Sequence, residues 1–178
     1  AAIGFAERSG GIGAALVSTG CASTNTITGV LSAWQDGVPC IFISGQNILM
    51  ETTSYTGLNI RTYGQQEADI VKIVKPITKY AHMLTKSEDI VDVMNKAISA
   101  ALSGRKGPVW IDVPLDLQSA LIDPVFLQND NSGIMYSKSV ASNDDIKALV
   151  ELFNSASRPI VLIGKGIKSS GTIREFAK

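Results

Sequence analysis

Two short and almost wholly apolar runs constrain the fold of this chain most strongly. Residues 39–44 (PCIFIS) and residues 108–113 (PVWIDV) each begin at a proline and are too short to form a core helix. Strands that read as continuous apolar runs are typical of parallel sheets, whose two faces are both covered by helices. The sequence therefore predicts two central strands of a buried parallel sheet.

Helical patterns alternate with these and other strand patterns. The clearest helix begins at a capping Ser87, carries apolar residues at helical spacing and ends at Gly104. The alternation predicts an α/β fold with a doubly wound parallel sheet, in which ligands bind beyond the carboxyl ends of the strands. The remaining predictions are strands over 14–18 and 81–84, helices from Ser23 or Thr24 to 36 and over 66–74, and ligand-edge loops at 19–25, at 45–64 and from 114 onward.

Composition excludes several classes of function. The 178 residues carry 16 basic and 16 acidic side chains, so no net charge favours nucleic acid as a partner. Two cysteines, Cys21 and Cys40, and the single histidine His82 are too few for a zinc site, so no metal ligand is predicted. Apolar runs are too short for a membrane span, and no export signal is evident. We therefore expect a cytoplasmic protein with reduced cysteines and no membrane partner.

The composition shifts after the last predicted strand, which indicates more than one domain. We predict a first domain over 1–118, a polar linker over 119–142 and the start of a second, truncated α/β domain over 143–178. In the second domain, Asn143 or Asp144 is expected to cap a helix that runs to 156. A strand over 160–163 and a turn at 164–166 are expected to follow.

Both ends of the sequence indicate a fragment. Residues 1–11 read as the last turns of a helix with glycine at its C-cap, and residues 172–178 begin a helical pattern without completing it. We therefore expect further chain on both sides.

Several motifs in order resemble the acetolactate synthase group of thiamine-diphosphate enzymes. The motifs are Gly4-Phe5-Ala6 with Ser9-Gly10, LVSTGCASTN (16–25), Asp36-Gly37-Val38-Pro39 leading to Gly45-Gln46, Gln66-Glu67-Ala68-Asp69, Thr78-Lys79, GPVWIDVP (107–114), and Arg158-Pro159 with Gly164-Lys165-Gly166. Each motif alone is weak, but their order and spacing identify the chain as a member of this group. The match corresponds to the pyrimidine-binding domain and the opening of the middle domain.

The resemblance implies a cofactor and a reaction. It implies that a glutamate about six residues before Ala1 activates thiamine diphosphate, which acts as electron sink for a decarboxylated 2-oxo acid. No catalytic residue is therefore expected within the chain, which alone should be inactive. The resemblance also implies that magnesium and diphosphate are held by a C-terminal domain outside this chain, and that the protein is a homodimer or homotetramer. Flavin (FAD) binds the middle domain of some members, but Lys165 replaces a usual glycine and FAD is not favoured here.

The resemblance also assigns residues to the site. Gln65 stands where acetolactate synthases carry a phenylalanine that shapes the pocket for a substrate methyl group. An amide at this position leads us to expect a more polar substrate than in acetolactate synthesis. The expected cofactor-binding residues are Thr19, Gly20, Cys21, Ala22, Asn25 and Gln46, and the expected substrate residues are Gln65, Gln66 and Lys79.

Two other interpretations compete with this one. A noncatalytic binding or assembly module would keep the fold without the chemistry, and the residue upstream of Ala1 would distinguish it from a carboligase or decarboxylase. A nicotinamide-binding domain is disfavoured because no Gly-x-Gly-x-x-Gly follows the first predicted strand, and Gly164 lacks the third glycine.

Overall fold

A computed structural model describes residues 1–127 and 140–178, which fall into two compact units. The first unit contains a sheet in which every pair of neighbouring strands is parallel. The predicted α/β class is confirmed. The strands are β1 (Gly13–Val17), β2 (Cys40–Gln46), β3 (Ala81–Met83) and β4 (Val109–Pro114), in the order β1-β2-β4-β3.

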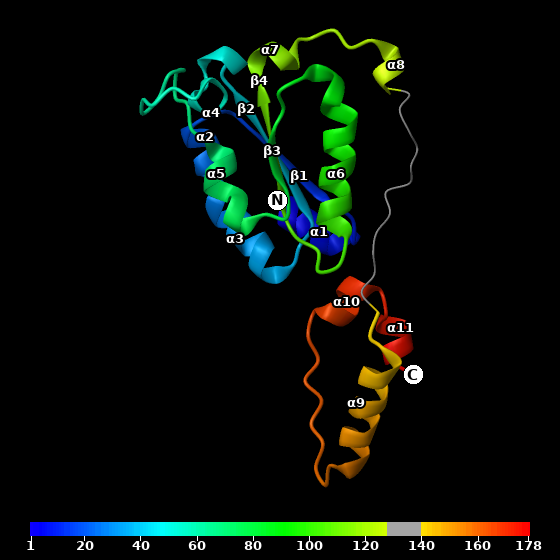
Figure 1. The fold of residues 1–178 in the computed structure, drawn as a ribbon. Coiled ribbons are helices and arrows are strands. Elements are labelled where there is room, and N and C mark those ends of the chain that lie inside the picture. Colours follow the sequence, from blue (N-terminus) through cyan, green and yellow to red (C-terminus); the bar gives the residue numbers. More distant parts are fainter. Residues whose placement is uncertain (128–139) are drawn as a thin grey trace. The chain divides into compact units, whose positions relative to one another are not determined.

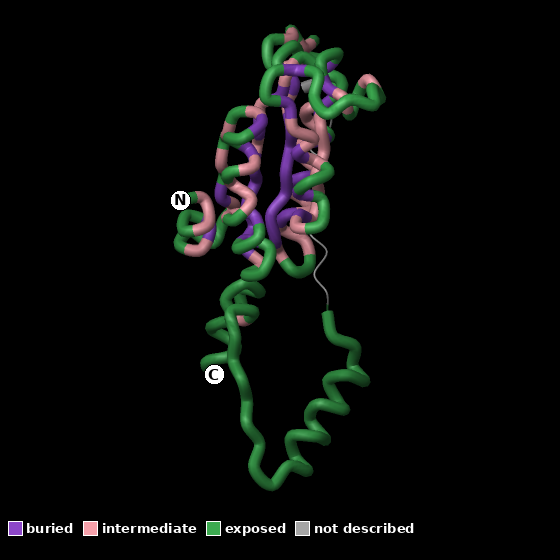
Figure 2. Tube along the Cα trace, turned by 90° about the vertical axis from the view of Figure 1, so that its left-hand side faces the viewer, coloured by how far each residue is buried: buried purple, intermediate pink, exposed green. Residues whose placement is uncertain are grey.

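Helices cover both faces of this sheet (Figure 1). Helices α1 (Ala2–Ser9), α3 (Ile27–Asp36) and α5 (Ile70–Val74) pack on one face, around Phe42 and Trp110. Helix α6 (Ile90–Leu102) packs on the other face, against Ile41 and Ile111. Successive side chains of a strand point to opposite faces, so β2 and β4 each contribute to both cores. Figure 2 shows the buried residues gathered along these strands and the inner sides of the helices.

The central strands confirm the sequence prediction in detail. Trp110 and Ile111 are fully buried, and the rings of Phe42 and Trp110 stack with their centroids 5.5 Å apart. The predicted glycine cap after the first helix is also confirmed, because Gly10 adopts the left-handed conformation directly after Ser9.

The predicted helix from Ser23 or Thr24 to residue 36 is wrong in its start. The chain instead forms a short α2 (Cys21–Thr24), followed by α3. The hydroxyl of Ser23 donates to the carbonyl of Gly20 (2.7 Å), and Thr24 donates to the carbonyl of Cys21 (3.3 Å). Hydroxyls that bond to preceding carbonyls do not cap a following helix, so neither residue is an N-cap.

Two further helix starts differ from the prediction. Residues 66–69 are not helical, and α5 begins only at Ile70, where the side chain of Asp69 caps it by accepting from the Lys72 amide (3.2 Å). Ser87 makes no capping bond, because it begins a 3-10 turn, η3 (Ser87–Asp89), that leads into α6. The other short helices of this unit are η1 (Leu49–Glu51), α4 (Thr53–Thr56), η2 (Lys75–Ile77), α7 (Leu115–Gln118) and α8 (Pro124–Leu127).

The second unit, as far as it is described, contains α9 (Asn143–Ser155), α10 (Gly166–Ser170) and α11 (Ile173–Phe176). The cap of α9 is Ser142, not Asn143 or Asp144; its hydroxyl accepts from the Asp145 amide, and the Asp145 carboxylate accepts from the Ser142 amide. The predicted strand over 160–163 is wrong: these residues are exposed and, among residues 140–178, no strand lies beside them to complete a ladder.

Half of the predicted linker over 119–142, residues 128–139, lies outside the described residues. In the part of the chain that is described, no helix combines the length and the apolar character that crossing a membrane requires.

Candidate functional site

The carboxyl ends of β1, β2 and β4 bring distant segments together (Figure 1). The turn at residues 18–20 follows β1, the loop over 47–69 follows β2, and α7 follows β4. Asp116 of α7 accepts a hydrogen bond from the Leu49 amide (3.0 Å), which fixes the start of the loop against the end of β4. This edge is the position at which ligands bind in open α/β sheets.

Gln46, the last residue of β2, connects the turn after β1, the loop over 47–69 and strand β4, and it is buried at 6% exposure. Its Nε2 donates to the carbonyl of Ala68 (3.0 Å) and to Asp112 Oδ2 (2.9 Å). Its Oε1 accepts from the Thr19 hydroxyl (2.9 Å) and from the Asn47 amide (3.0 Å). Both N–H donors of Gln46 are thus engaged within the protein, and Thr19 joins Gln46 to the turn after β1.

Asp112 lies on β4 and is 1% exposed, so its carboxylate depends on hydrogen bonds from neighbours. Ser44 donates to Oδ1 (2.5 Å), and the Ser44 oxygen accepts from the indole Nε1 of Trp110 (2.8 Å). Burial raises the pKa of Asp112 to about 6, even though the bonds from Ser44 and Gln46 act in the opposite direction. A titratable group with a raised pKa therefore stands directly behind the candidate site.

Gly20 and Gln66 meet through their backbones. A Cβ atom added to Gly20 would lie 2.1 Å from the Gln66 carbonyl oxygen, and Gly20 has a φ of 61°. Gln66 has a φ of 57° and is the one non-glycine residue with positive φ among those described. Such a conformation in a long side-chain residue costs about 1–2 kcal/mol and marks a position held by its surroundings.

Glu67 organises the loop between β2 and α5. Its Oε1 accepts from both the amide and the hydroxyl of Thr53 (2.6 Å each), and its Oε2 accepts from the Tyr63 amide (2.7 Å). Burial alone would raise the pKa of Glu67, but the hydrogen bonds from Thr53, Tyr63 and Gly64 outweigh it and lower the pKa. Glu67 thus ties Thr53 and Tyr63 of the loop to the segment that contains Gln66.

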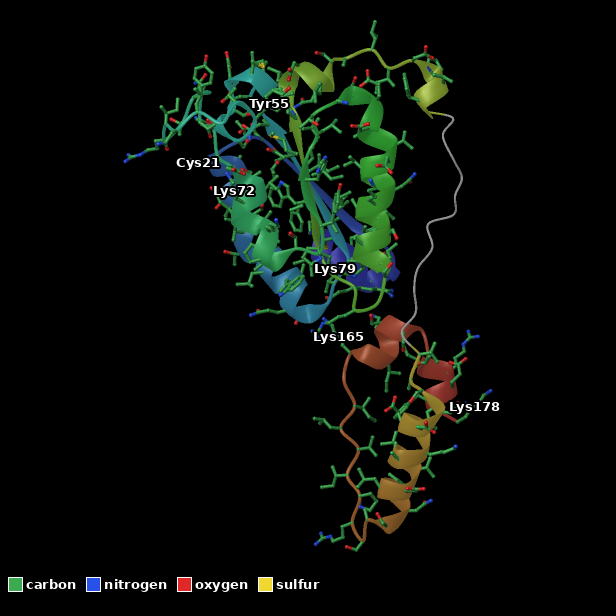
Figure 3. All side chains as sticks on the ribbon, viewed as in Figure 1. Cys21, Tyr55, Lys72, Lys79, Lys165 and Lys178 are labelled. Atoms are coloured by element: carbon green, nitrogen blue, oxygen red, sulfur yellow. The ribbon has the colours of Figure 1, made fainter. Side chains whose placement is uncertain are left out.

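The structure brings most predicted site residues to this edge. Thr19 and Gly20 form the turn after β1, with Gln46 behind them and Gln66 against Gly20. Cys21, labelled in Figure 3, begins α2 directly after this turn and is exposed, as are Ala22, Asn25 and Gln65. The small exposed side chains of Cys21 and Ala22 leave the backbone at the start of α2 accessible to a flat ligand.

Lys79 is not brought to this edge. It lies just before β3, at the amino-terminal end of the sheet, and Figure 3 shows it at the opposite end of the unit from Cys21 and Tyr55. Its Nζ donates to the carbonyl of Ser103, at the C-terminus of α6. Burial lowers the pKa of Lys79.

Three residues of this edge were missed from the sequence: Ser44, Asp112 and Glu67. A signal was available for the first two, since both are polar positions inside runs predicted to be buried, and buried polar groups require partners. Glu67 gave no such signal, because its partners Thr53 and Tyr63 lie in a segment whose sequence shows no periodicity.

Among residues 1–127 and 140–178, no three His, Cys, Asp or Glu side chains gather into a possible metal centre. Cys21 and Cys40 are free thiols, the first exposed and the second buried.

Comparison with known proteins agrees with this geometry. Residues 1–73 match the family described as thiamine pyrophosphate enzyme, N-terminal TPP binding domain. The acetolactate synthase large subunit of Lactococcus lactis is 31% identical over 173 residues, which is 97% of this chain and 29% of the relative. Acetolactate synthase isozyme 3 large subunit of Escherichia coli is 34% identical over 170 residues, or 94% of this chain and 28% of the relative. A probable acetolactate synthase large subunit of Methanocaldococcus jannaschii is 34% identical over 182 residues, which is 100% of this chain and 29% of the relative.

A parallel α/β unit with its candidate site at the carboxyl edge and the family match together define the class: residues 1–73 belong to the N-terminal TPP binding domain family of thiamine pyrophosphate enzymes. Within that class the chain is similar, over nearly its whole length, to acetolactate synthase large subunits. It spans less than a third of the length of the curated relatives it matches.

Proposed function

We propose that this chain forms the pyrimidine-side wall of a thiamine diphosphate site in a longer carboligase or decarboxylase that acts on a 2-oxo acid. The observation that carries the proposal is the close contact of Gly20 with Gln66, which places a residue without a side chain against the strained Gln66 backbone at the ligand edge. The similarity to acetolactate synthase large subunits supports the reaction class, a transferase or a lyase.

The residues at this edge fit the aminopyrimidine ring of the cofactor. Cys21 and Ala22, which directly follow Gly20, are small and exposed, so a flat ring can approach the backbone at the start of α2 closely. Thr19 supplies a polar group in the turn, and Asn25 supplies one directly after α2. When bound, the cofactor supplies the electron sink for the decarboxylated 2-oxo acid.

The same proposal assigns the domains of the chain and the roles of the rest of the protein. Residues 1–118 form the pyrimidine-binding domain, 119–142 the linker, and 143–178 the start of a middle domain. The activating glutamate and the groups that hold magnesium and diphosphate belong to other parts of the protein, and FAD is not assigned. We propose a homodimer or homotetramer in the cytoplasm.

The substrate is proposed to be more polar than that of an acetolactate synthase. Gln65 is exposed beside Gln66 and places an amide where the group is expected to carry an aromatic ring. An amide that bonds a substrate hydroxyl favours polar acceptors, such as hydroxylated aldehydes or ketones, over the methyl ketone of pyruvate.

The test is carboligation by the intact protein with pyruvate alone and with pyruvate plus glyceraldehyde. We expect the polar acceptor to be preferred, and Gln65→Phe to shift the preference toward acetolactate by about 10-fold or more. Turnover of pyruvate to acetolactate as the main reaction of the unchanged protein would contradict the polar-substrate proposal. No binding of thiamine diphosphate with Mg²⁺ would contradict the enzyme proposal and favour a noncatalytic module.

A further inference from the structure

A continuous chain of hydrogen bonds crosses the sheet from its core to the candidate site. It runs from the Trp110 indole to Ser44, to the Asp112 carboxylate, to the Gln46 amide and then to the Thr19 hydroxyl. The members lie on β4, on β2 and just after β1, so the chain ties three neighbouring strands at their carboxyl ends. Ser44, Asp112 and Gln46 are buried, whereas Thr19 is half-exposed.

The chemistry of the partners fixes the orientation of the Gln46 amide. The Asn47 backbone N–H can only donate, so the atom that faces it must be the carbonyl Oε1. The Ala68 carbonyl and the ionised Asp112 carboxylate can only accept, so the atom between them must be Nε2. If the Gln46 amide were flipped, its NH₂ group would face the Asn47 N–H and its oxygen would face the Ala68 carbonyl and the Asp112 carboxylate. These unfavourable pairs would be buried.

The orientation of Gln46 determines what Thr19 can do. The Thr19 hydroxyl has one proton and two lone pairs, and the proton is given to Gln46 Oε1 at 2.9 Å. Only lone pairs are then available on the side that faces away from Gln46. Thr19 is therefore an acceptor toward anything that binds at the turn after β1.

We propose that Asp112 is a positioning residue that holds Gln46 in this orientation, so that Thr19 presents only acceptor lone pairs and selects a hydrogen-bond donor on the ligand. The identity of that ligand rests on the proposed function. An aminopyrimidine carries donors of this kind, whereas a phosphate or carboxylate oxygen would be repelled by the lone pairs.

Among the charged neighbours, Asp69, the cap of α5, adds to the effect of burial on Asp112 and raises its pKa further. No cation is among the groups that shift this pKa. The Asp112 carboxylate is therefore stabilised by hydrogen-bond donors, Ser44 and Gln46, which makes these bonds sensitive to its protonation.

The first test uses nuclear magnetic resonance of the intact protein without ligand. We expect the Asp112 carboxyl carbon and the Gln46 side-chain amide signals to titrate with one midpoint near 6. Asp112→Leu should shift the Gln46 signals and speed exchange of its amide protons. Asp112→Asn keeps an oxygen for Gln46 and can donate to Ser44, so it should restore slow exchange while abolishing the titration. The exposed Asp92→Asn of α6 is the control and should change neither.

If the Gln46 side-chain signals change neither in Asp112→Leu nor with pH, Asp112 does not position Gln46 and the proposal is overturned. If the leucine variant fails to fold, the titration and the asparagine variant still decide, because a Gln46 step that persists in Asp112→Asn does not come from Asp112.

The second test measures binding of thiamine diphosphate with Mg²⁺. Thr19→Val removes the acceptor at nearly constant shape and should weaken binding about 10-fold, whereas Thr19→Ser should stay within about twofold. In the Asp112→Leu background, Thr19→Val should have little further effect; additive losses would overturn the coupling. No binding by the unchanged protein would contradict the proposed function, and the magnetic resonance comparison alone would then decide the positioning role.

Discussion

The Gln66 carbonyl oxygen occupies the space in which a Cβ atom on Gly20 would lie, at a separation of 2.1 Å. Both residues have positive φ, 61° for Gly20 and 57° for Gln66, so two unusual backbone conformations face each other at the ligand edge. The turn after β1 and the segment before α5 therefore pack tightly through their backbones. A substitution at Gly20 or Gln66 must displace the backbone of the other residue.

Gly20→Ala is expected to destabilise the protein strongly. The substitution adds the cost of positive φ, about 1–2 kcal/mol, to a backbone clash that adds about 1–3 kcal/mol. Chemical denaturation should show the combined loss. Gly57→Ala is the matched control, because Gly57 has a φ of 70° but nothing within 4 Å of the added atom. Equal losses of stability in Gly20→Ala and Gly57→Ala would show that the Gln66 backbone moves away from the added methyl group at no cost, so that the contact is not tight.

Gln66→Gly is expected to stabilise the fold by up to ~1 kcal/mol while weakening ligand binding. Glycine adopts positive φ without strain, although its greater freedom in the unfolded chain offsets part of the gain. Denaturation and a thiamine diphosphate binding measurement should be made on the same preparation. The neighbouring Gln65→Gly, which lacks positive φ, should not stabilise. A Gln66→Gly variant less stable than the unchanged protein would mean that side-chain contacts outweigh the strain.

The sequence predicted the elements that are defined by local pattern and burial. The strands β2 and β4 were evident because both faces are covered, which leaves continuous apolar runs. The C-cap of α1 was evident because glycine at that place has one clear use.

The predictions that failed depend on partners distant in sequence. The helix predicted over 66–74 begins at Ile70 because Glu67 is bound to Thr53 and Tyr63 and Gln66 is held against Gly20. Residues 160–163 read as a strand, but apolar composition does not supply the neighbouring strand that a ladder needs. In the candidate site, Thr19, Gly20, Gln46 and Gln66 were predicted by resemblance, whereas the contacts that link them to Asp112 required the three-dimensional structure.

Glu67→Gln is expected to loosen the loop after β2. An amide can accept from only one side, so the Thr53 or Tyr63 amide would face a donor, at a cost of about 2 kcal/mol. Hydrogen exchange of the Thr53 and Tyr63 amides should rise. The exposed Glu51→Gln is the control and should leave both amides unchanged.

The same residue predicts a pH dependence. The pKa of Glu67 is lowered by folding, so the unfolded chain binds its proton more readily. The stability that Glu67 contributes is therefore fully present above its ordinary pKa of 4.5 and is lost as the pH falls through the lower folded value. Denaturation curves between about pH 3 and 7 should show this loss in the unchanged protein and not in Glu67→Gln. Parallel curves for the two proteins would contradict the assignment.

Lys79→Met distinguishes a structural role from the substrate role expected from resemblance. Methionine keeps the packing of the stem but removes the ammonium that donates to the Ser103 carbonyl at the C-terminus of α6, where a positive charge is favourable. We expect a loss of about 1 kcal/mol in stability and faster amide exchange in the last turn of α6, with thiamine diphosphate and substrate affinities unchanged. Lys96→Met, on the exposed face of the same helix, should have a smaller effect. A weaker substrate affinity with unchanged stability would instead place Lys79 in the site, and would require that a segment outside this unit bring the substrate to the amino-terminal end of the sheet.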